Sequence, residues 1–336
     1  MNTISKRMLA CTAMAAALLT GSVGVLVAQE KPVIATVVKI SGIPWFDRLE
    51  TGVKAFQEAN PDVSASQSGP ATADSAQQLQ IVQDLIAKGV NALAVVPMDP
   101  AVLEGTFKRA MERGIIVVTH EADNQTNTNA DVEAFDNDDY GAALNARLAE
   151  CMGNSGKWTT FVGSLGSRTH IQWVTAGENN AKKHPDMVLV DPNNESFDDA
   201  NATYEKAKEI LRKHPDIKGF QTSAGNDVLG VGRAIDEAGL TGKVCLVGTG
   251  LPNPSADLLE SGAITAIGFW DPQKAGMAMN VVAKLLIEKK EVTDGMDLGV
   301  PGYEKVAVTK GAGDGLLIIG NGMVLADKST YKEHMF

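Results

Sequence analysis

The chain has 336 residues, which exceeds the usual size of one domain and favours two lobes. Its formal net charge of −11 argues against nucleic acid as a partner, because nucleic-acid binding requires patches of Lys and Arg. Hydrophobic residues make up 44% of the chain and aromatic residues only 5%, so we expect a core of Ala, Val, Leu and Ile.

The N-terminus has the charged-then-apolar order of a secretory signal peptide. Lys6 and Arg7 precede a mostly apolar run over residues 8–27. We predict a signal peptide over residues 1–28 and a mature protein that starts near Gln29, with a cut a few residues earlier as the alternative. Removing the two basic residues lowers the net charge from −11 to −13. We therefore expect an exported, periplasmic protein.

After this segment, short apolar runs alternate with helical patterns. The runs are nearly continuous in Val, Ile, Leu and Ala, which is typical of strands buried on both faces of a parallel sheet. In chain order they cover residues 33–40, 92–97, 115–120, 158–164, 187–191, 219–224, 244–250 and 264–270.

Helical periodicity fills the intervals between these runs. One helix is predicted from the cap at Asp74 to Gly89, and another from Asp199 to a stop before Pro215. The alternation of strands and helices predicts an α/β fold with doubly wound parallel sheets.

Two cysteines remain in the mature chain. Cys151 lies in a helical segment and Cys245 lies inside a strand. Export permits a disulfide, yet nothing in their sequence contexts brings the two together. We therefore expect buried free thiols.

The motifs of enzymes that use this type of sheet are missing from the sequence. There is no phosphate-binding loop, no dinucleotide-binding glycine pattern and no G-x-S-x-G nucleophile elbow. The five histidines show no zinc-ligand spacing. We expect a protein that is not an enzyme and that needs no cofactor and no metal.

Several longer motifs resemble a known family. AKGVNALAVVPMDP and AMERGIIVVTHEA resemble the periplasmic sugar-binding proteins of ABC importers, the ribose-binding type. VVKISGIPWF, QWV, VGTGLPN and LLESGAITAIGFWDPQKAG are similar to the autoinducer-2 and rhamnose-binding branch. The resemblance covers nearly all of residues 31–336. It implies a type I periplasmic binding protein: a monomer with two lobes that close around a small polyhydroxy ligand and deliver it to an ABC permease in the inner membrane.

On that fold the chain would cross between the lobes three times. We expect crossings near residues 136–138, 270–272 and 298–302. The N-terminal lobe would then hold residues 31–137 and 272–299. The C-terminal lobe would hold residues 138–271 and 300–336.

Candidate ligand-binding residues fall at the carboxyl ends of strands, where open α/β sheets bind ligands. Flat aromatic faces cover the C–H surface of a sugar, while charged and amide groups bond its hydroxyls. The predicted residues of the first rim are Lys39, Trp45, Phe46, His120, Glu121, Asp136 and Asn137. Those of the opposite rim are Thr169, His170, Ala224, Asn226, Trp270 and Asp271.

Each aromatic candidate also has a purely structural interpretation. Trp45 or Phe46 could pack under the first helix. Trp270 precedes Asp271-Pro272, where the chain is expected to leave regular geometry. We therefore predict that Trp270 forms a wall of the cleft and is not part of a lobe's core.

The polar candidates have structural alternatives as well. Lys39 and Glu121 could form an ion pair without any ligand, and that pair remains compatible with ligand contact. Asp136 and Asn137 could be a hinge turn or a helix cap.

Ligand identity stays open at the sequence level. Where the autoinducer-2 branch has Asp-Gln, this chain has Thr169-His170, and Glu121 stands where the branch has Asp. We therefore favour a small sugar or sugar alcohol and keep an autoinducer-2 receptor for quorum signalling as the alternative. A secreted carbohydrate-active enzyme, pairing Glu121 with Asp136 or Asp271, is a remote alternative.

Overall fold

A computed structural model of the protein describes residues 31–336. The predicted signal peptide and its cleavage site lie outside these residues. Within residues 31–336, no helix has both the length and the apolar character needed to cross a membrane. The described chain is organised around two mostly parallel sheets, so the predicted α/β class is confirmed.

The first sheet has the spatial order β12-β13-β5-β4-β3-β1-β2. Its neighbouring strands are parallel except for β12 and β13, which pair antiparallel at one edge. We call this sheet and the helices packed on it the first lobe. Its strands are β1 (Val33–Val37), β2 (Ser64–Ser68), β3 (Ala92–Val95), β4 (Ile116–Thr119), β5 (Ala130–Glu133), β12 (Ala307–Lys310) and β13 (Leu316–Ile319).

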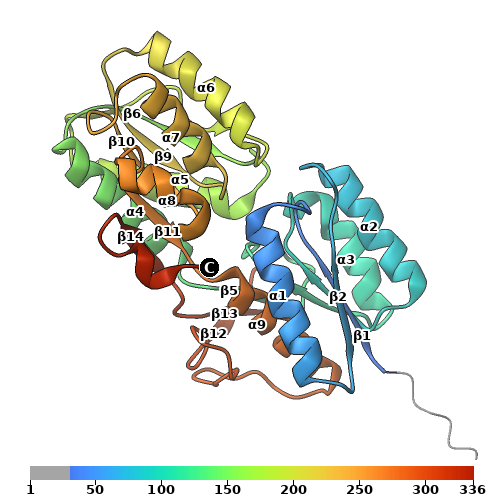
Figure 1. Cartoon of the computed structure of the whole chain (residues 1–336). Coiled ribbons are helices and arrows are strands. Elements are labelled where there is room, and N and C mark those ends of the chain that lie inside the picture. The colour runs from blue at the N-terminus through green and yellow to red at the C-terminus, as the bar shows by residue number, and fades with distance from the viewer. Residues whose placement is uncertain (1–30) are drawn as a thin grey trace, which may run out of the picture. The chain divides into compact units, whose positions relative to one another are not determined.

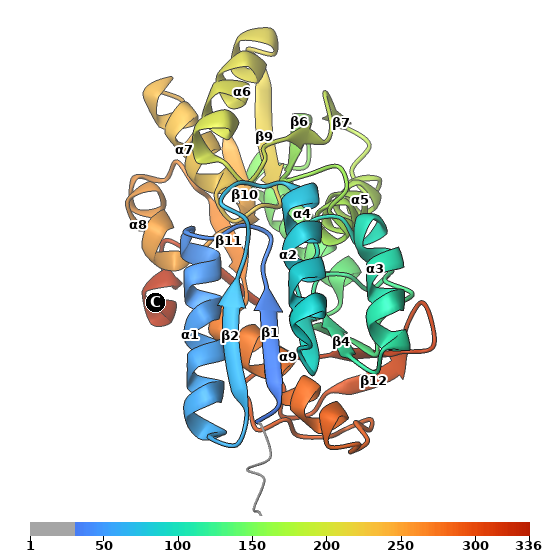
Figure 2. The same ribbon diagram turned by 90° about the vertical axis from the view of Figure 1, so that its right-hand side faces the viewer.

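The inner strands of this sheet are covered on both faces. In β1, Ile34 belongs to one apolar cluster, whereas Ala35 and Val37 belong to another, as side-chain alternation along a strand requires. Helix α1 packs against α9, and α2 packs against α3, so each face receives one pair of helices (Figure 2). These helices are α1 (Pro44–Ala59), α2 (Ser75–Lys88), α3 (Pro100–Glu112) and α9 (Pro272–Ile287).

The second sheet has the order β14-β11-β10-β9-β6-β7, and β8 pairs with β6. β14 runs antiparallel to β11 at one edge. We call this sheet and its helices the second lobe, in which α4 packs on α5, and α6 lies beside α7 (Figure 1). Its strands are β6 (Gly156–Val162), β7 (Met187–Leu189), β8 (Asn194–Glu195), β9 (Ile217–Thr222), β10 (Cys245–Thr249), β11 (Ala266–Phe269) and β14 (Val324–Asp327). Its helices are α4 (Asn137–Met152), α5 (Arg168–Ala181), α6 (Ala200–Lys213), α7 (Asp227–Glu237), α8 (Pro252–Ser261) and the 3-10 turn η1 (Tyr331–His334).

Both predicted helices are confirmed, with their starts and ends. The Asp74 carboxylate accepts two backbone N–H groups at the start of α2, and Gly89 ends that helix with φ of 76°. Asp199 caps α6 in the same way. Local capping chemistry therefore sets where these helices begin and end.

The third predicted crossing is wrong. The chain passes from β5 into α4 and from β11 into α9, but residues 300–319 remain in the first lobe. There β13 pairs with β5, and β12 pairs with β13. The chain returns to the second lobe only between Ile319 and Val324, because two further strands extend the first sheet before it leaves.

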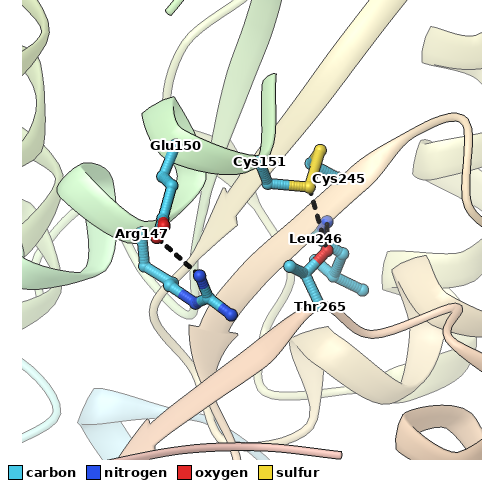
Figure 3. Close-up of a disulfide and its surroundings, with 6 residues drawn as sticks. All are labelled: Arg147, Glu150, Cys151, Cys245, Leu246 and Thr265. Carbon is cyan, nitrogen blue, oxygen red and sulfur yellow. Dashed lines mark hydrogen bonds and ion pairs between the residues drawn. A yellow bond between two sulfur atoms is a disulfide. The ribbon is translucent and has the colours of Figure 1, made fainter. Parts of the chain in front are cut away.

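The prediction of free thiols is also wrong. Cys151 and Cys245 form a disulfide with their Cα atoms 6.0 Å apart (Figure 3). Cys151 lies in the last turn of α4, and Cys245 begins β10, on which α4 packs. Packing between a helix and a strand separated by 94 residues brings the two together, and no local sequence signal reports it.

Candidate functional site

Two charged side chains follow strands β1 and β4 and meet at the carboxyl edge of the first sheet. Lys39 Nζ lies 2.5 Å from Glu121 Oε2, and both side chains are at least nine-tenths buried. Glu121 has a φ of 59°, a conformation that residues with side chains rarely adopt. Such backbone strain is typical of functional positions.

The surroundings of Glu121 keep its carboxylate ionised. Burial alone would raise the pKa of Glu121, but Lys39, followed by His120 and His170, lowers it to about 2. The buried Glu121 carboxylate therefore stays charged beside the Lys39 side chain.

The second lobe reaches the same pair through the N-terminus of α5. Thr169 Oγ1 donates to Glu121 Oε2 at 3.2 Å, and Lys39 Nζ donates to Ser167 Oγ at 3.4 Å. Nearby, Arg168 donates to Asp123 of the first lobe at 2.6 Å. Polar contacts thus join the lobes directly across the site.

His170 and Asp198 complete the polar part of the site from the second lobe. The Gly163 N–H donates to His170 Nδ1 at 3.1 Å. Burial, with a smaller effect of Lys39, lowers the pKa of His170 to about 3, so the imidazole is neutral. Burial raises the pKa of Asp198 to about 6.

Aromatic rings surround these polar groups. The ring centroids of Trp45 and Trp270 are 4.6 Å apart in an edge-to-face arrangement, and Trp173 lies 5.7 Å from Trp270. A Cβ added at Gly225 of the second lobe would lie 3.0 Å from Trp45, so glycine there lets this first-lobe ring approach closely. Trp270 therefore lies between aromatic rings of both lobes.

These groups enclose one small cavity. Its volume is about 20 Å³, room for roughly one water molecule. A monosaccharide does not fit in that space, so admitting one requires the lobes to separate. The lining residues are Lys39, Ile43, Trp45, Phe46, Glu121, His170, Trp173, Asp198, Ser223, Gly225, Thr249 and Trp270.

Six of the predicted binding residues line this cavity: Lys39, Trp45, Phe46, Glu121, His170 and Trp270. Thr169 is not in the lining but donates a hydrogen bond to Glu121, which is. Phe46, Trp45 and Trp270 are also buried in the apolar cluster of the lobes. The prediction that Trp270 lies outside the core is therefore wrong, because its ring belongs to this cluster and lines the cavity as well.

The remaining predicted residues lie outside the cavity lining, and three of them cap or orient neighbouring elements. Asp136 is exposed and caps α4. Asn137 Oδ1 accepts from Trp173 Nε1 at 2.7 Å, which orients that ring. Asp271 caps α9 and forms a two-bond ion pair with Arg48.

Three others are next to lining residues in the chain or bond to one. His120 is buried, and its Nδ1 is bonded to the Val132 carbonyl. The Ala224 N–H donates to Asp227, and Asn226 Nδ2 donates to the Asp198 carbonyl. His120 precedes Glu121, Ala224 lies between Ser223 and Gly225, and Asn226 holds the backbone of Asp198.

Sequence reasoning missed six positions of the lining: Ile43, Trp173, Asp198, Ser223, Gly225 and Thr249. Ser223 and Thr249 could have been found, since each lies at the carboxyl end of a strand. Trp173 is one helical turn beyond Thr169 and His170, so it shares their face of α5. Gly225 and Asp198 carry no comparable signal.

Comparison with known proteins decides the family. A family model described as a periplasmic binding protein domain matches residues 34–291. The chain belongs to the periplasmic binding protein family.

Named relatives and solved structures of periplasmic binding proteins agree with this assignment. The chain is 29% identical to the D-ribose/D-allose-binding protein of Pseudomonas aeruginosa over 70% of this chain and 76% of that protein. An ABC transporter solute-binding protein from Clostridium phytofermentas with bound L-rhamnose superposes with a TM-score of 0.84 at 21% identity, covering 90% and 98% of the two chains. LsrB from Clostridium saccharobutylicum in complex with AI-2 gives 0.83 at 19% identity, covering 90% and 100%. These two structures confirm the type I fold.

Proposed function

We propose that this periplasmic binding protein captures a small sugar or sugar alcohol between its lobes and delivers it to an ABC permease in the inner membrane. The observation that carries the proposal is the buried Lys39–Glu121 pair, which shares one interlobe cavity with Trp45, Phe46 and Trp270. The names of the relatives add support, since they refer to ribose, allose and rhamnose.

The chemistry of the cavity suits hydroxyl groups. Glu121 accepts hydrogen bonds and Lys39 donates them, and charge-assisted bonds of this kind are about twice as strong as neutral ones. In the closed arrangement, Glu121 accepts a hydrogen bond from the Thr169 hydroxyl, and Lys39 donates one to the Ser167 hydroxyl. A ligand hydroxyl would take the place of these serine and threonine contacts, so that it joins the lobes as they do.

Ligand capture would then work by a shift of population. An open form admits the ligand, and only the closed form presents both lobes to it. The permease would recognise the closed, loaded form. The proposal includes export through the predicted signal peptide and action as a monomer.

An autoinducer-2 receptor is the second candidate function. The LsrB structure and the Lys39 position favour it. Thr169, His170 and Glu121 depart from the pattern of that branch, so sugars rank first. The alternative of a secreted carbohydrate-active enzyme paired Glu121 with Asp136 or Asp271. Neither aspartate lines the cavity with Glu121, so these two pairs find no support.

A ligand screen tests the proposal. The mature protein is unfolded thermally in the presence of monosaccharides, polyols and autoinducer-2, and calorimetry then measures Kd for each compound that stabilises it. A ligand at about 100 Kd should raise the free energy of unfolding by about 2.7 kcal/mol. A complete panel without any stabilising compound would contradict the proposed function, and stabilisation by autoinducer-2 alone would establish the second candidate.

A further inference from the structure

Asp198 is a buried carboxylate of the cavity that no structural duty explains. It lies between β8 and α6, yet the neighbouring Asp199 caps α6. Its side chain lines the cavity, and its residue is only 7% exposed. Within residues 31–336, its Oδ2 atom has no hydrogen-bond partner. Buried polar atoms are nearly always bonded, so an unbonded carboxylate oxygen beside a cavity points to a ligand.

The backbone at this point is strained in a way that directs the side chain inward. Phe197 and Asp198 have φ values of 56° and 54°, two consecutive left-handed residues that are not glycine. Phe197 is 52% exposed, whereas Asp198 is buried. Strain of this kind persists where the surrounding structure holds it, and it concentrates at functional sites.

The neighbouring strand leaves room for the carboxylate. A Cβ added at Gly163, just after β6, would lie 2.7 Å from Asp198 Oδ2 and 2.9 Å from His170 Cε1. Only glycine permits both side chains to converge there. The second lobe thus presents an acceptor carboxylate beside a neutral imidazole.

The charges around the cavity restrict which ligand can bind. The first lobe contributes Lys39 and Glu121, which already neutralise each other. The second lobe contributes Asp198 and the neutral His170, and Asp227 of α7 lies behind Asp198. Lys39 also acts on Asp198, but it is one cation facing the two carboxylates Glu121 and Asp198. This excess of carboxylate disfavours anionic ligands and favours hydroxyl donors.

We propose that Asp198 binds ligand directly, accepting a hydrogen bond from a hydroxyl of a neutral polyhydroxy compound and rejecting the corresponding acid. The proposal rests on the proposed function, since it assigns the ligand class of the same cleft. Each lobe then supplies one carboxylate, Glu121 or Asp198, so that a ligand hydroxyl bonded to each would join the two lobes.

Matched compounds and matched variants test this role. Ribitol and D-ribonate are similar in size, but only D-ribonate is charged. Each sugar that binds in the screen forms a second matched pair with its own aldonate. Calorimetry measures Kd for the parent, Asp198→Asn, Asp198→Ala and the control Asp186→Asn, whose carboxylate is exposed in the same lobe. We expect the parent to bind the neutral compound at least tenfold more tightly than its acid.

Both Asp198 variants should bind the neutral compound at least tenfold more weakly, and their preference over the acid should shrink. Their unfolding temperature at pH 7.5 should not fall, because they remove a buried charge without a partner. A structural role predicts the opposite: lower unfolding temperature with unchanged Kd. If both variants kept the parent's affinity and its preference for the neutral compound over the acid, the role of Asp198 would be overturned, while the proposed function would stand. Failure of the parent to bind any compound would overturn the proposed function and this role with it.

Discussion

The Lys39–Glu121 pair shows how one buried contact can serve both folding and binding. Neither charge could remain buried alone, since an ion without a partner in the interior is strongly destabilising. The pair is held on two adjacent strand ends, and Thr169 and Ser167 complete its bonds. Its geometry is therefore set before any ligand arrives, which reduces the ordering that binding requires.

Removing one partner of this pair should affect stability and affinity together. Lys39→Met or Glu121→Gln should lower the free energy of unfolding by about 3–5 kcal/mol, because one buried charge loses its partner. Each should also weaken sugar binding by about 1.5–3 kcal/mol. Urea unfolding and calorimetry measure the two effects, with the exposed Lys305→Met and Glu58→Gln as controls.

The double variant separates the two contributions. Replacing both residues with apolar side chains should recover stability but not affinity, since the hydroxyl-binding groups are gone. The pKa of Glu121 is about 2, so the stability it contributes is present above its ordinary pKa and is lost as pH falls toward 2. Single variants with parent-like stability and affinity would exclude the pair from both roles.

Asp131 and Glu133 form a second buried acidic pair, on β5 of the first lobe. They lie two residues apart, so their side chains share one face of the strand. Burial raises the pKa of Asp131 to about 6, and burial together with the Asp131 charge raises that of Glu133. Among the described residues, both Asp131 carboxylate oxygens have no hydrogen-bond partner.

Asp131→Asn should therefore stabilise the protein at high pH. A carboxyl whose pKa is raised on folding favours the folded state below its ordinary pKa of 3.8, and that contribution is lost as pH rises through about 6. We expect the variant to gain about 1–3 kcal/mol at pH 8 and little at pH 4. Urea unfolding at both pH values, with Asp186→Asn as control, measures this; a loss of stability at pH 8 would show that the charge is needed.

At the scale of elements, hydrophobic runs predicted the inner strands, and capping residues predicted helix ends. The missed strands have different chemistry. β2 reads SASQS and alternates between exposed and half-buried side chains, so it has no apolar run. β5 is buried throughout, but Asp131 and Glu133 interrupt its apolar pattern, so the sequence did not predict a strand there. β12 and β13 were also not predicted. Because these two strands belong to the first sheet, the third crossing was predicted too early in the chain.

The strand-end rule found much of the site because parallel strands share one edge. It could not find Asp198, which follows the two-residue strand β8 and enters the cavity through an unusual backbone conformation. It also could not pair Cys151 with Cys245, since their proximity follows from how α4 packs on β10. Long-range packing and strained backbone are the parts that local patterns do not encode.

The disulfide should stabilise the second lobe without affecting binding. It closes a loop over a sequence separation of 94 residues, so its loss should lower the free energy of unfolding by about 2–5 kcal/mol. Cys245 starts β10, whereas the cavity residue Thr249 ends it, so Kd should stay unchanged. Urea unfolding and calorimetry on Cys151→Ser/Cys245→Ser measure both; an equal loss in stability and affinity would link the disulfide to the cleft.

For residues 31–336 as a whole, the proposed function requires two arrangements of the lobes. The closed cavity of about 20 Å³ is too small for a sugar. The Arg168–Asp123 ion pair and the contacts to Lys39 and Glu121 hold the lobes together, and all of them are polar contacts that water can replace. Aromatic contacts also cross between the lobes, because Trp45 packs near Gly225 and Trp270 lies between Trp45 and Trp173. Separation of the lobes therefore exposes these rings as well, and a ligand would shift the balance by replacing the polar contacts and covering the rings.

Trp270 should report this change, because it lies next to the second crossing and touches aromatic rings of both lobes. Opening alters its surroundings at Trp45 and Trp173, whereas Trp158 lies buried within β6. Saturating ligand should therefore change the tryptophan emission of the parent. Trp270→Phe should remove much of that emission change and leave the fold intact. Trp45→Phe should remove another part of the change. The control Trp158→Phe should keep the whole emission change. If Trp270→Phe matched the parent in both emission change and affinity, Trp270 would be core alone, and the aromatic wall of the cleft would consist of Trp45, Phe46 and Trp173.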